Sequence, residues 1–126
     1  MNGKFLLDTN FIIYALNSKA KLPSFTYCYS PITKIELLAY PKLTTDENNT
    51  IQAVLGRMQL VECDARVVDK TIAIRRNTGL KLPDSLICAS SIVASATLVT
   101  DDDRLHRVQG VDALTYRDFM SLIGKV

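Results

Sequence analysis

Acidic residues follow two short strand-like runs of this chain, at positions where side chains from distant segments can work together. Asp8 comes directly after the run at residues 4–7, and three consecutive aspartates, residues 101–103, follow the run at residues 97–100. In a parallel α/β sheet the carboxyl ends of the strands share one edge, where ligands bind. An Asp there can simply cap the next helix, but a cap does not need three adjacent like charges, which repel one another unless a cation or basic group offsets them. We therefore expect these acids to meet at one edge of a sheet.

Two further acids, Glu36 and Asp84, lie in predicted helices that are otherwise mostly apolar. Asp84 is in the first turn of a helix expected at residues 82–94, where free amides and the helix dipole favour a carboxylate. Glu36 lies in a helix expected at residues 31–40. Its apolar neighbours, which we expect to face the core, are Ile32, Ile35, Leu38 and Ala39. The alternatives are that Glu36 lies on the surface side of its helix and that Asp84 is only a capping residue.

If these acids converge, they predict a metal site. Four carboxylates a few ångströms apart cannot all stay ionised without a counter-charge. Mg²⁺ and Mn²⁺ prefer oxygen ligands, and such ions activate water and stabilise the charge that develops on a phosphodiester under in-line attack. A metal would also give a chain with a net charge of only +2 the local positive charge to bind a polyanion. The predicted chemistry is phosphodiester hydrolysis without a covalent intermediate.

Short apolar runs alternate with amphipathic stretches along the chain, which predicts an α/β fold around a mostly parallel sheet. The strands are expected at residues 4–7, 27–29, 60–63, 97–100 and 111–114. The helices are expected at residues 11–16, 31–40, 46–58, 64–79, 82–94 and from residue 115 onward. The residues expected to cap them are Asp8 or Asn10, Ser30, Asp46, Asp64 and Thr115.

Length and composition indicate a folded protein with one domain, residues 1–126. Hydrophobic residues make up 48% and charged residues 22% of the 126 residues, which is ordinary for a globular protein. No apolar stretch approaches the roughly 18–20 residues of a membrane span, and the few apolar residues before Asp8 do not resemble a signal peptide. We therefore expect a cytoplasmic protein without a membrane partner.

Cysteine and histidine offer no zinc site. The three cysteines, Cys28, Cys63 and Cys88, are far apart in sequence and contain no Cys-x-x-Cys pair, and the single His106 cannot complete a Cys/His site. We expect all three cysteines to be small buried hydrophobic residues in a reducing compartment.

Four short segments resemble, in order, the motifs of the PIN-domain family. They are Leu-Leu-Asp-Thr-Asn at residues 6–10, Pro-Ile-Thr-Lys-Ile-Glu-Leu at 31–37, Gly-Leu-Lys-Leu-Pro-Asp-Ser-Leu-Ile-Cys-Ala at 79–89 and Thr-Leu-Val-Thr-Asp-Asp-Asp-Arg-Leu at 97–105. Each segment is weak alone, but in this order and at these spacings they are specific, and the resemblance covers about residues 6–119. Among PIN domains the chain most resembles the VapC-type toxins of bacterial toxin–antitoxin pairs and their solitary relatives.

The resemblance implies a three-layer α/β/α, Rossmann-like fold with a mostly parallel twisted sheet of four to five strands. It also implies an endoribonuclease that depends on one or two Mg²⁺ or Mn²⁺ ions and cleaves single-stranded RNA, as the toxin of a toxin–antitoxin pair. Its RNA partner would be single-stranded or structured RNA. A homodimer and an antitoxin protein are the implied protein partners. The helices after Pro41 and Asp64 carry apolar residues that would form a dimer face or an antitoxin groove, or that simply belong to the core.

Carried over position by position, the resemblance implies four acids that bind metal and catalyse: Asp8, Glu36, Asp84 and Asp102. Asp101 is an alternative or additional ligand, because the run of three aspartates makes this edge more negative than is usual in the family. The residues that match supporting positions are Thr9, Asn10, Thr33 and Thr100. Lys81, Arg104 and His106 flank the site and are expected either to contact RNA phosphates or to be ordinary solvated charges.

Two other functions stay open on the sequence alone. A PIN-like fold can serve mainly to bind protein or RNA with little or no catalysis; loss of the acids would mark that case, and all four acids are present. A phosphotransferase of the haloacid-dehalogenase type also begins with an Asp after its first strand. It needs a second Asp two residues later, where this chain has Asn10.

Overall fold

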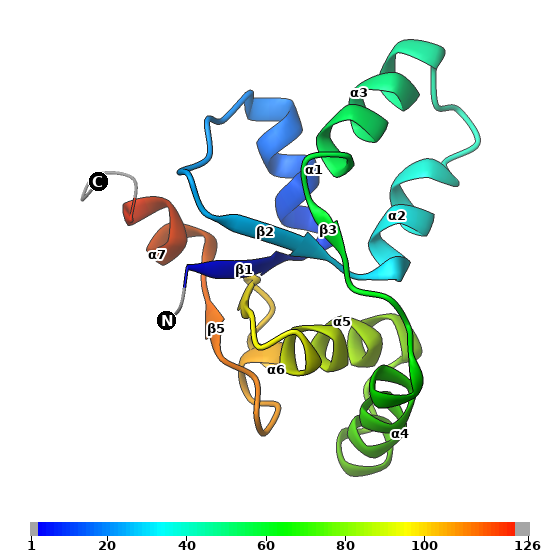
Figure 1. Cartoon of the computed structure of the whole chain (residues 1–126), viewed down its shortest axis with the longest axis vertical. Coiled ribbons are helices and arrows are strands. Elements are labelled where there is room, and N and C mark those ends of the chain that lie inside the picture. The colour runs from blue at the N-terminus through cyan, green and yellow to red at the C-terminus, as the bar shows by residue number, and fades with distance from the viewer. Residues whose placement is uncertain (1–2, 123–126) are drawn as a thin grey trace.

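The structure is a computed structural model that describes residues 3–122. Within that range a five-stranded sheet lies between two layers of helices (Figure 1), and all its strand pairs are parallel. The strands are β1 (Lys4–Leu7), β2 (Thr26–Tyr29), β3 (Gln59–Leu60), β4 (Thr97–Val99) and β5 (Ala113–Leu114), in the order β3-β2-β1-β4-β5. The predicted three-layer α/β fold with a parallel sheet is confirmed.

Seven helices connect and follow the strands in the described part of the chain. They are α1 (Thr9–Ser18), α2 (Pro31–Leu38), α3 (Thr45–Leu55), α4 (Ala65–Thr78), α5 (Leu82–Val93), α6 (Asp103–His106) and α7 (Tyr116–Ser121). Helices α1, α2, α3 and α7 cover one face of the sheet, and α4, α5 and α6 cover the other (Figure 1). The short helix α6 is the one that the sequence pattern does not predict.

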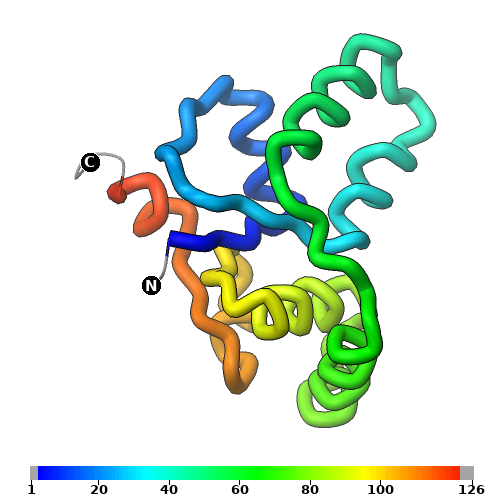
Figure 2. Tube along the Cα trace, in the orientation of Figure 1, coloured from blue at the N-terminus to red at the C-terminus, as the bar shows by residue number. Residues whose placement is uncertain are grey.

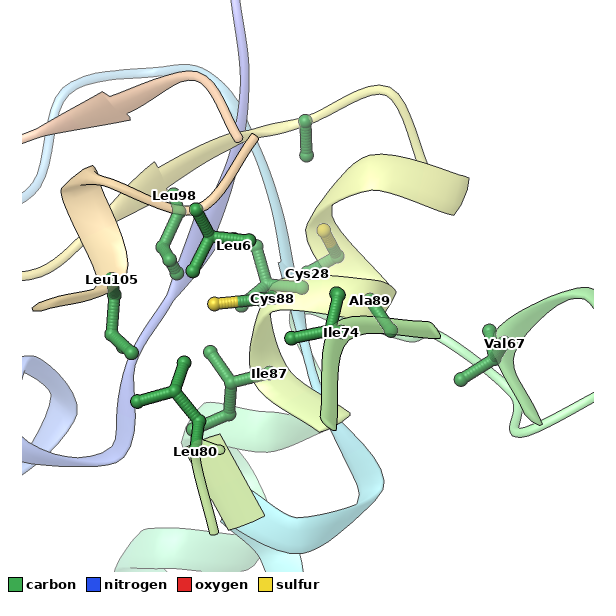
Figure 3. Packing of buried hydrophobic residues seen from close by; sticks show 12 residues of the cluster. Leu6, Cys28, Val67, Ile74, Leu80, Ile87, Cys88, Ala89, Leu98 and Leu105 are labelled. Carbon is green, nitrogen blue, oxygen red and sulfur yellow. The ribbon is translucent and has the colours of Figure 1, made fainter. Parts of the chain in front are cut away.

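Alternating side chains of β1 contribute to two separate cores. Phe5 and Leu7 are buried on the face covered by α1, α3 and α7, whereas Leu6 is buried on the opposite face. In that second core Leu6 packs in one cluster with Cys88 of α5 and Leu105 of α6 (Figure 3). This packing fixes the positions of α5 and α6 relative to the strands, which matters because Asp84 lies in the first turn of α5 and Asp102 caps α6.

Most helices start where the sequence predicts because a side chain caps their free amides. Asp8 caps α1, Ser30 caps α2 with Pro31 in its first turn, and Asp64 caps α4. Helix α4 ends at Gly79, whose φ of 72° is the left-handed conformation that glycine adopts without strain.

Two local predictions on the helices are wrong. Helix α3 is capped by Thr44, which forms a capping box with Glu47, whereas Asp46 lies in the first turn. On α2 the buried apolar residue is Leu37, whereas Ile35 is 59% exposed and Ala39, just after the helix, is exposed too. The short α2 has apolar residues on several sides, so periodicity alone does not determine which side is buried.

The predicted burial of the cysteines is confirmed for two of them. Burial raises the pKa of the Cys28 thiol to about 11 and that of the Cys88 thiol to about 12, so both stay protonated. Cys63 is exposed, contrary to the prediction, because it lies in the loop between β3 and α4. Within residues 3–122, no helix combines the length and the apolar character that crossing a membrane requires.

Candidate active site

The site lies at the carboxyl edge of the sheet, between the neighbouring strands β1 and β4. Leu7 pairs with Val99, so the next residues, Asp8 and Thr100, lie side by side. The Asp8 amide donates to the Val99 carbonyl at 3.2 Å and extends the ladder to the end of the strand. The chain lays β2 and β3 on one side of β1 and then crosses back to lay β4 and β5 on the other (Figure 2). This change of direction is a topological switch point, where α/β sheets bind ligands.

All four predicted acids line one cavity at this edge. The cavity has a volume of about 130 Å³, and its walls come from the starts of α1 and α5, from α2 and from the segment after β4. The acids in the lining are Asp8, Glu36, Asp84 and Asp102. The other lining residues are Thr9, Asn10, Pro83, Ile87, Thr100 and Leu105. Four separate stretches of chain therefore bring carboxylates to one cavity.

Asp8 is a buried acid, only 7% exposed. Its Oδ1 accepts hydrogen bonds from the Phe11 amide at 2.7 Å, which caps α1, and from the Tyr116 hydroxyl at 2.9 Å. Burial raises the pKa of the Asp8 carboxyl; the Thr100 hydroxyl, the Phe11 amide and the Tyr116 hydroxyl lower it, and the charge of Asp101 raises it further. The net effect is a raised pKa. A cation bound close to Asp8 would lower this pKa and favour the charged carboxylate.

Glu36 is held in place by a relay of hydroxyl groups. The Thr9 hydroxyl donates to Glu36 Oε1 at 2.9 Å and lies 2.9 Å from the Thr33 hydroxyl. A hydroxyl has one hydrogen, so with Thr9 donating to Glu36, Thr33 is the donor to Thr9. Thr33 is fully buried and lies one turn before Glu36 on α2. The relay ties α2 to the start of α1 and fixes the direction of the Glu36 carboxylate.

Asp84 and Asp102 share one guanidinium group. Arg104 Nη2 lies 2.6 Å from Asp102 Oδ2 and 3.2 Å from Asp84 Oδ2, and Arg104 Nε donates to Asp102 Oδ1 at 3.1 Å. The hydrogen bonds from Arg104 lower the pKa of the Asp102 carboxyl. The Asp102 amide donates to the Thr100 hydroxyl at 3.1 Å, and the Arg104 amide donates to Asp102 Oδ1 at 3.0 Å, which fixes the turn between β4 and α6.

The remaining predicted residues lie outside the lining of the cavity. The Asp101 carboxylate accepts from the Tyr116 amide at the start of α7 and does not line the cavity, whereas Asp102 does. This favours Asp102 as the site acid of the segment after β4. His106 Nε2 lies 2.6 Å from the Thr100 carbonyl, so this ring nitrogen faces the backbone. Lys81 is exposed at the start of α5.

Tyr116 is a site residue that the sequence pattern did not reveal. Its hydroxyl reaches Asp8, 108 positions away, and its amide donates to Asp101 Oδ1 at 2.8 Å. Burial raises the pKa of the Tyr116 phenol, so the hydroxyl stays protonated and donates. Its ring packs edge-on against Phe11, with centroids 4.8 Å apart. The sequence did contain a signal for this contact. Tyr116 follows β5, which ends at Leu114, at the same edge of the parallel sheet as the end of the strand before Asp8.

The chemistry of the lining fits a hard divalent cation. Its donors are carboxylate, hydroxyl and amide oxygens, without sulfur or imidazole, and Mg²⁺ and Mn²⁺ prefer oxygen ligands. As the side chains stand, no three Asp, Glu, His or Cys residues within the described range 3–122 are gathered closely enough to hold one ion. Asp84 and Asp102 would have to release Arg104 before they could bind the same ion as Asp8. The acids are therefore ligands of the type that the metal prefers. In the present orientation, Asp84 and Asp102 are paired with Arg104 instead.

The chain is similar in sequence to one protein family and in fold to several solved structures. The sequence matches the PIN domain family over residues 5–111. No curated protein matches it in sequence. The chain is similar in structure to VapBC2 from Rickettsia felis bound to a DNA fragment of its promoter (TM-score 0.77, 20% identity, covering 89% of this chain and 98% of that chain). It is also similar to DNA-bound VapBC from Salmonella typhimurium (0.78, 20%, 89% and 97%) and to PAE2754 from Pyrobaculum aerophilum (0.70, 16%, 100% and 98%).

This chain belongs to the PIN-domain family. The similarity to VapBC structures confirms the predicted fold, and the family match confirms the predicted resemblance to PIN domains. Membership in the family also decides against a phosphotransferase of the haloacid-dehalogenase type.

Proposed function

We propose that the whole chain, residues 1–126, acts as one divalent-metal-dependent endoribonuclease domain that cleaves single-stranded RNA, as the toxin of a toxin–antitoxin pair. The observation that carries this proposal is the convergence of Asp8, Glu36, Asp84 and Asp102 in one cavity at the switch point of the sheet. A phosphodiester adds its own negative charge, so a cavity lined by four acids needs a cation to accept it. Membership in the PIN-domain family and similarity to VapBC structures support the same activity.

In this proposal Asp8, Asp84 and Asp102 hold one Mg²⁺ or Mn²⁺ ion, and Glu36 contributes to a second. When bound, such ions supply an activated water and neutralise charge on the phosphate, so hydrolysis needs no covalent intermediate. The protein fixes the direction of its acids in advance. The α1 amide and Tyr116 orient Asp8, the hydroxyl relay orients Glu36, and supporting partners of this kind commonly tune a metal site.

Contacts to RNA phosphates are proposed for Arg104 first, then for Lys81 and His106. The Arg104 guanidinium lies at the cavity, and its planar fork suits a phosphate as well as a carboxylate. Lys81 is exposed beside the same cavity wall, at the start of α5. His106 would first have to leave the Thr100 carbonyl.

Cleavage of a labelled pool of random single-stranded RNA by the purified protein tests the proposed function. We expect cleavage with Mg²⁺ or Mn²⁺, and a rate at least about a hundredfold lower after chelation with EDTA, because the acids depend on the cation to bind and activate the reactants. Added Mn²⁺ should restore the rate. Cleavage that continues in excess EDTA, or no cleavage with either metal, would contradict the proposal.

Replacing Tyr116 by Phe tests how Asp8 is oriented. The variant keeps the ring against Phe11 and loses the hydroxyl that donates to Asp8. Because loss of a supporting partner of a metal ligand costs about ten- to a hundredfold, we expect about a tenfold lower kcat with little change in Tm. Tyr14→Phe is the matched control, since Tyr14 stacks on Tyr116 but does not line the cavity. A Tyr116→Phe rate equal to that of the control would argue against the positioning role.

We further propose an antitoxin protein as a partner, bound in an apolar groove between α1, α2 and α3. The groove has a volume of about 690 Å³ and adjoins Glu36, and its apolar lining consists of Ile13, Leu16, Leu37, Tyr40, Leu43 and Ile51. An amphipathic helix of the antitoxin would bury these residues in the helix-in-groove manner. The predicted homodimer also stays a proposal, for which Val68 and Ile72, exposed on α4, offer an apolar surface.

A further inference from the structure

Arg104 contacts two of the four site acids at once. Its Nη2 lies between Asp102 Oδ2 and Asp84 Oδ2, and its Nε donates to Asp102 Oδ1. Both oxygens of Asp102 are thereby engaged in the fork geometry that makes arginine–carboxylate pairs strong. The guanidinium therefore uses the same oxygen atoms that a divalent cation would use.

A second arginine shows which part of this arrangement is local. Arg66 lies two residues after Asp64, the cap of α4, just as Arg104 lies two residues after Asp102, the cap of α6. Arg66 also donates to its cap through Nε at 3.3 Å and Nη2 at 3.0 Å. Contact with the cap is thus a property of these helix starts. Arg104 differs because it also reaches Asp84, 20 positions earlier on another helix, and so spans two walls of the cavity.

We propose that Arg104 is an internal counter-ion that competes with the divalent metal for Asp84 and Asp102 and thereby sets the metal affinity of the site. This inference rests on the proposed function, because it takes the same acids as metal ligands. Without a positive charge between them, the two carboxylates would repel each other. Arg104 holds them together in the metal-free protein, and a cation has to displace it to reach their oxygens.

The competition should be moderate and should couple metal binding to RNA binding. The Arg104 side chain is 58% exposed, so solvent screens the ion pair and the metal can displace it. The released guanidinium would then lie at the edge of the cavity, where a phosphate offers it a second fork-shaped partner. One side chain would therefore leave the acids when the metal arrives and bind the RNA that the metal is to act on.

Calorimetric titration of Mn²⁺ into the full chain, without RNA, tests this inference. We expect Arg104→Gln to bind Mn²⁺ about two- to fivefold more tightly than wild type, the range expected for loss of an exposed competing ion pair. Arg104→Lys keeps the charge and loses the fork, so it should also bind more tightly, by a smaller factor. Arg66→Gln, which removes the matched pair outside the cavity, should bind Mn²⁺ as wild type does.

Thermal unfolding gives a second readout that does not depend on activity. Without metal, Arg104→Gln should have a lower Tm than wild type, because Asp84 and Asp102 lose their shared counter-ion. Saturating Mn²⁺ should raise its Tm by more than it raises that of wild type, because a tighter ligand stabilises the folded state more.

The outcomes separate this inference from the proposed function. If wild type binds Mn²⁺ and Asp8→Asn does not, the metal site stands; Arg104→Gln binding with unchanged or lower affinity would then overturn the inference alone. Arg104→Lys binding no more tightly than wild type would also overturn it, because net charge rather than occupied oxygens would then explain the effect of Arg104→Gln. If wild type binds no Mn²⁺, both the inference and the metal-dependent function fall.

Discussion

Asp8→Asn should cleave RNA more than about a hundredfold more slowly than wild type, and its metal-free form should be more stable. The substituted side chain keeps an Oδ1 that can accept from the Phe11 amide and the Tyr116 hydroxyl, so the cap of α1 survives. It loses the negative charge that a divalent cation needs. Loss of a mere supporting partner of a metal ligand costs about ten- to a hundredfold, so loss of the ligand itself should cost more.

The gain in stability follows from the burial of Asp8. Burial raises the pKa of this carboxyl above its ordinary value. The folded state of wild type is therefore most stable, as far as this group is concerned, at low pH, and its free energy of unfolding falls as the pH rises through that raised pKa. Asn does not titrate there. At pH 7 in EDTA we expect the free energy of unfolding of Asp8→Asn to exceed that of wild type by on the order of 1 kcal/mol, and the difference should shrink as the pH falls toward 4. Thermal and denaturant unfolding of both proteins measure it.

Asp64→Asn is the matched control for this variant. Asp64 caps α4 as Asp8 caps α1, and it does not line the cavity. Cleavage by Asp64→Asn should equal that of wild type. Wild-type cleavage by Asp8→Asn would refute the role of this acid, and an Asp8→Asn protein less stable than wild type would refute the cost assigned to its buried charge.

Glu36→Gln should lower kcat by about a hundredfold and leave stability unchanged. Glu36 is exposed, and its Oε1 accepts from Thr9. Gln keeps an acceptor oxygen and nearly the same shape, so the hydroxyl relay and α2 persist while the charge needed for the second ion is lost. Cleavage at saturating Mn²⁺ and the Tm of the metal-free protein measure the two effects.

Glu62→Gln provides the comparison for Glu36→Gln. Glu62 is exposed in the loop after β3 and does not line the site cavity, so its variant should match wild type in both rate and Tm. A Glu36→Gln protein that retains the wild-type rate would remove Glu36 from the mechanism. A marked fall in its Tm would mean that the relay supports the fold rather than the chemistry.

The position of Asp8 could be predicted from sequence because parallel sheets follow a simple rule. Side chains that come directly after neighbouring parallel strands share one edge, and the pairing of Leu7 with Val99 places Asp8 beside Thr100 as that rule requires. The same rule applies to Tyr116, which follows β5, and a strand was predicted there at residues 111–114. The link from Tyr116 to Asp8 was missed because the rule was applied to acidic residues alone.

Side-chain directions on the short helices could not be predicted in the same way. The rotation of α2 about its axis depends on its contacts with α1, α3 and α5, so the sequence pattern wrongly assigned Ile35 to the core. Helix α6 has four residues, too few to show a period, so its start at Asp103, capped by Asp102, was not apparent. The ion pair of Arg104 with Asp84 depends on how α5 and α6 pack on Leu6 and its neighbours, which is a tertiary effect (Figure 3).

Anomalous diffraction from crystals of the wild-type protein soaked in Mn²⁺ tests the central claim most directly. We predict an anomalous peak in the cavity, within about 2.0–2.6 Å of carboxylate oxygens of Asp8, Asp84 and Asp102, with the guanidinium of Arg104 moved off both aspartates. Well-occupied Mn²⁺ peaks elsewhere on the protein, with none in this cavity and Arg104 still paired, would contradict the account.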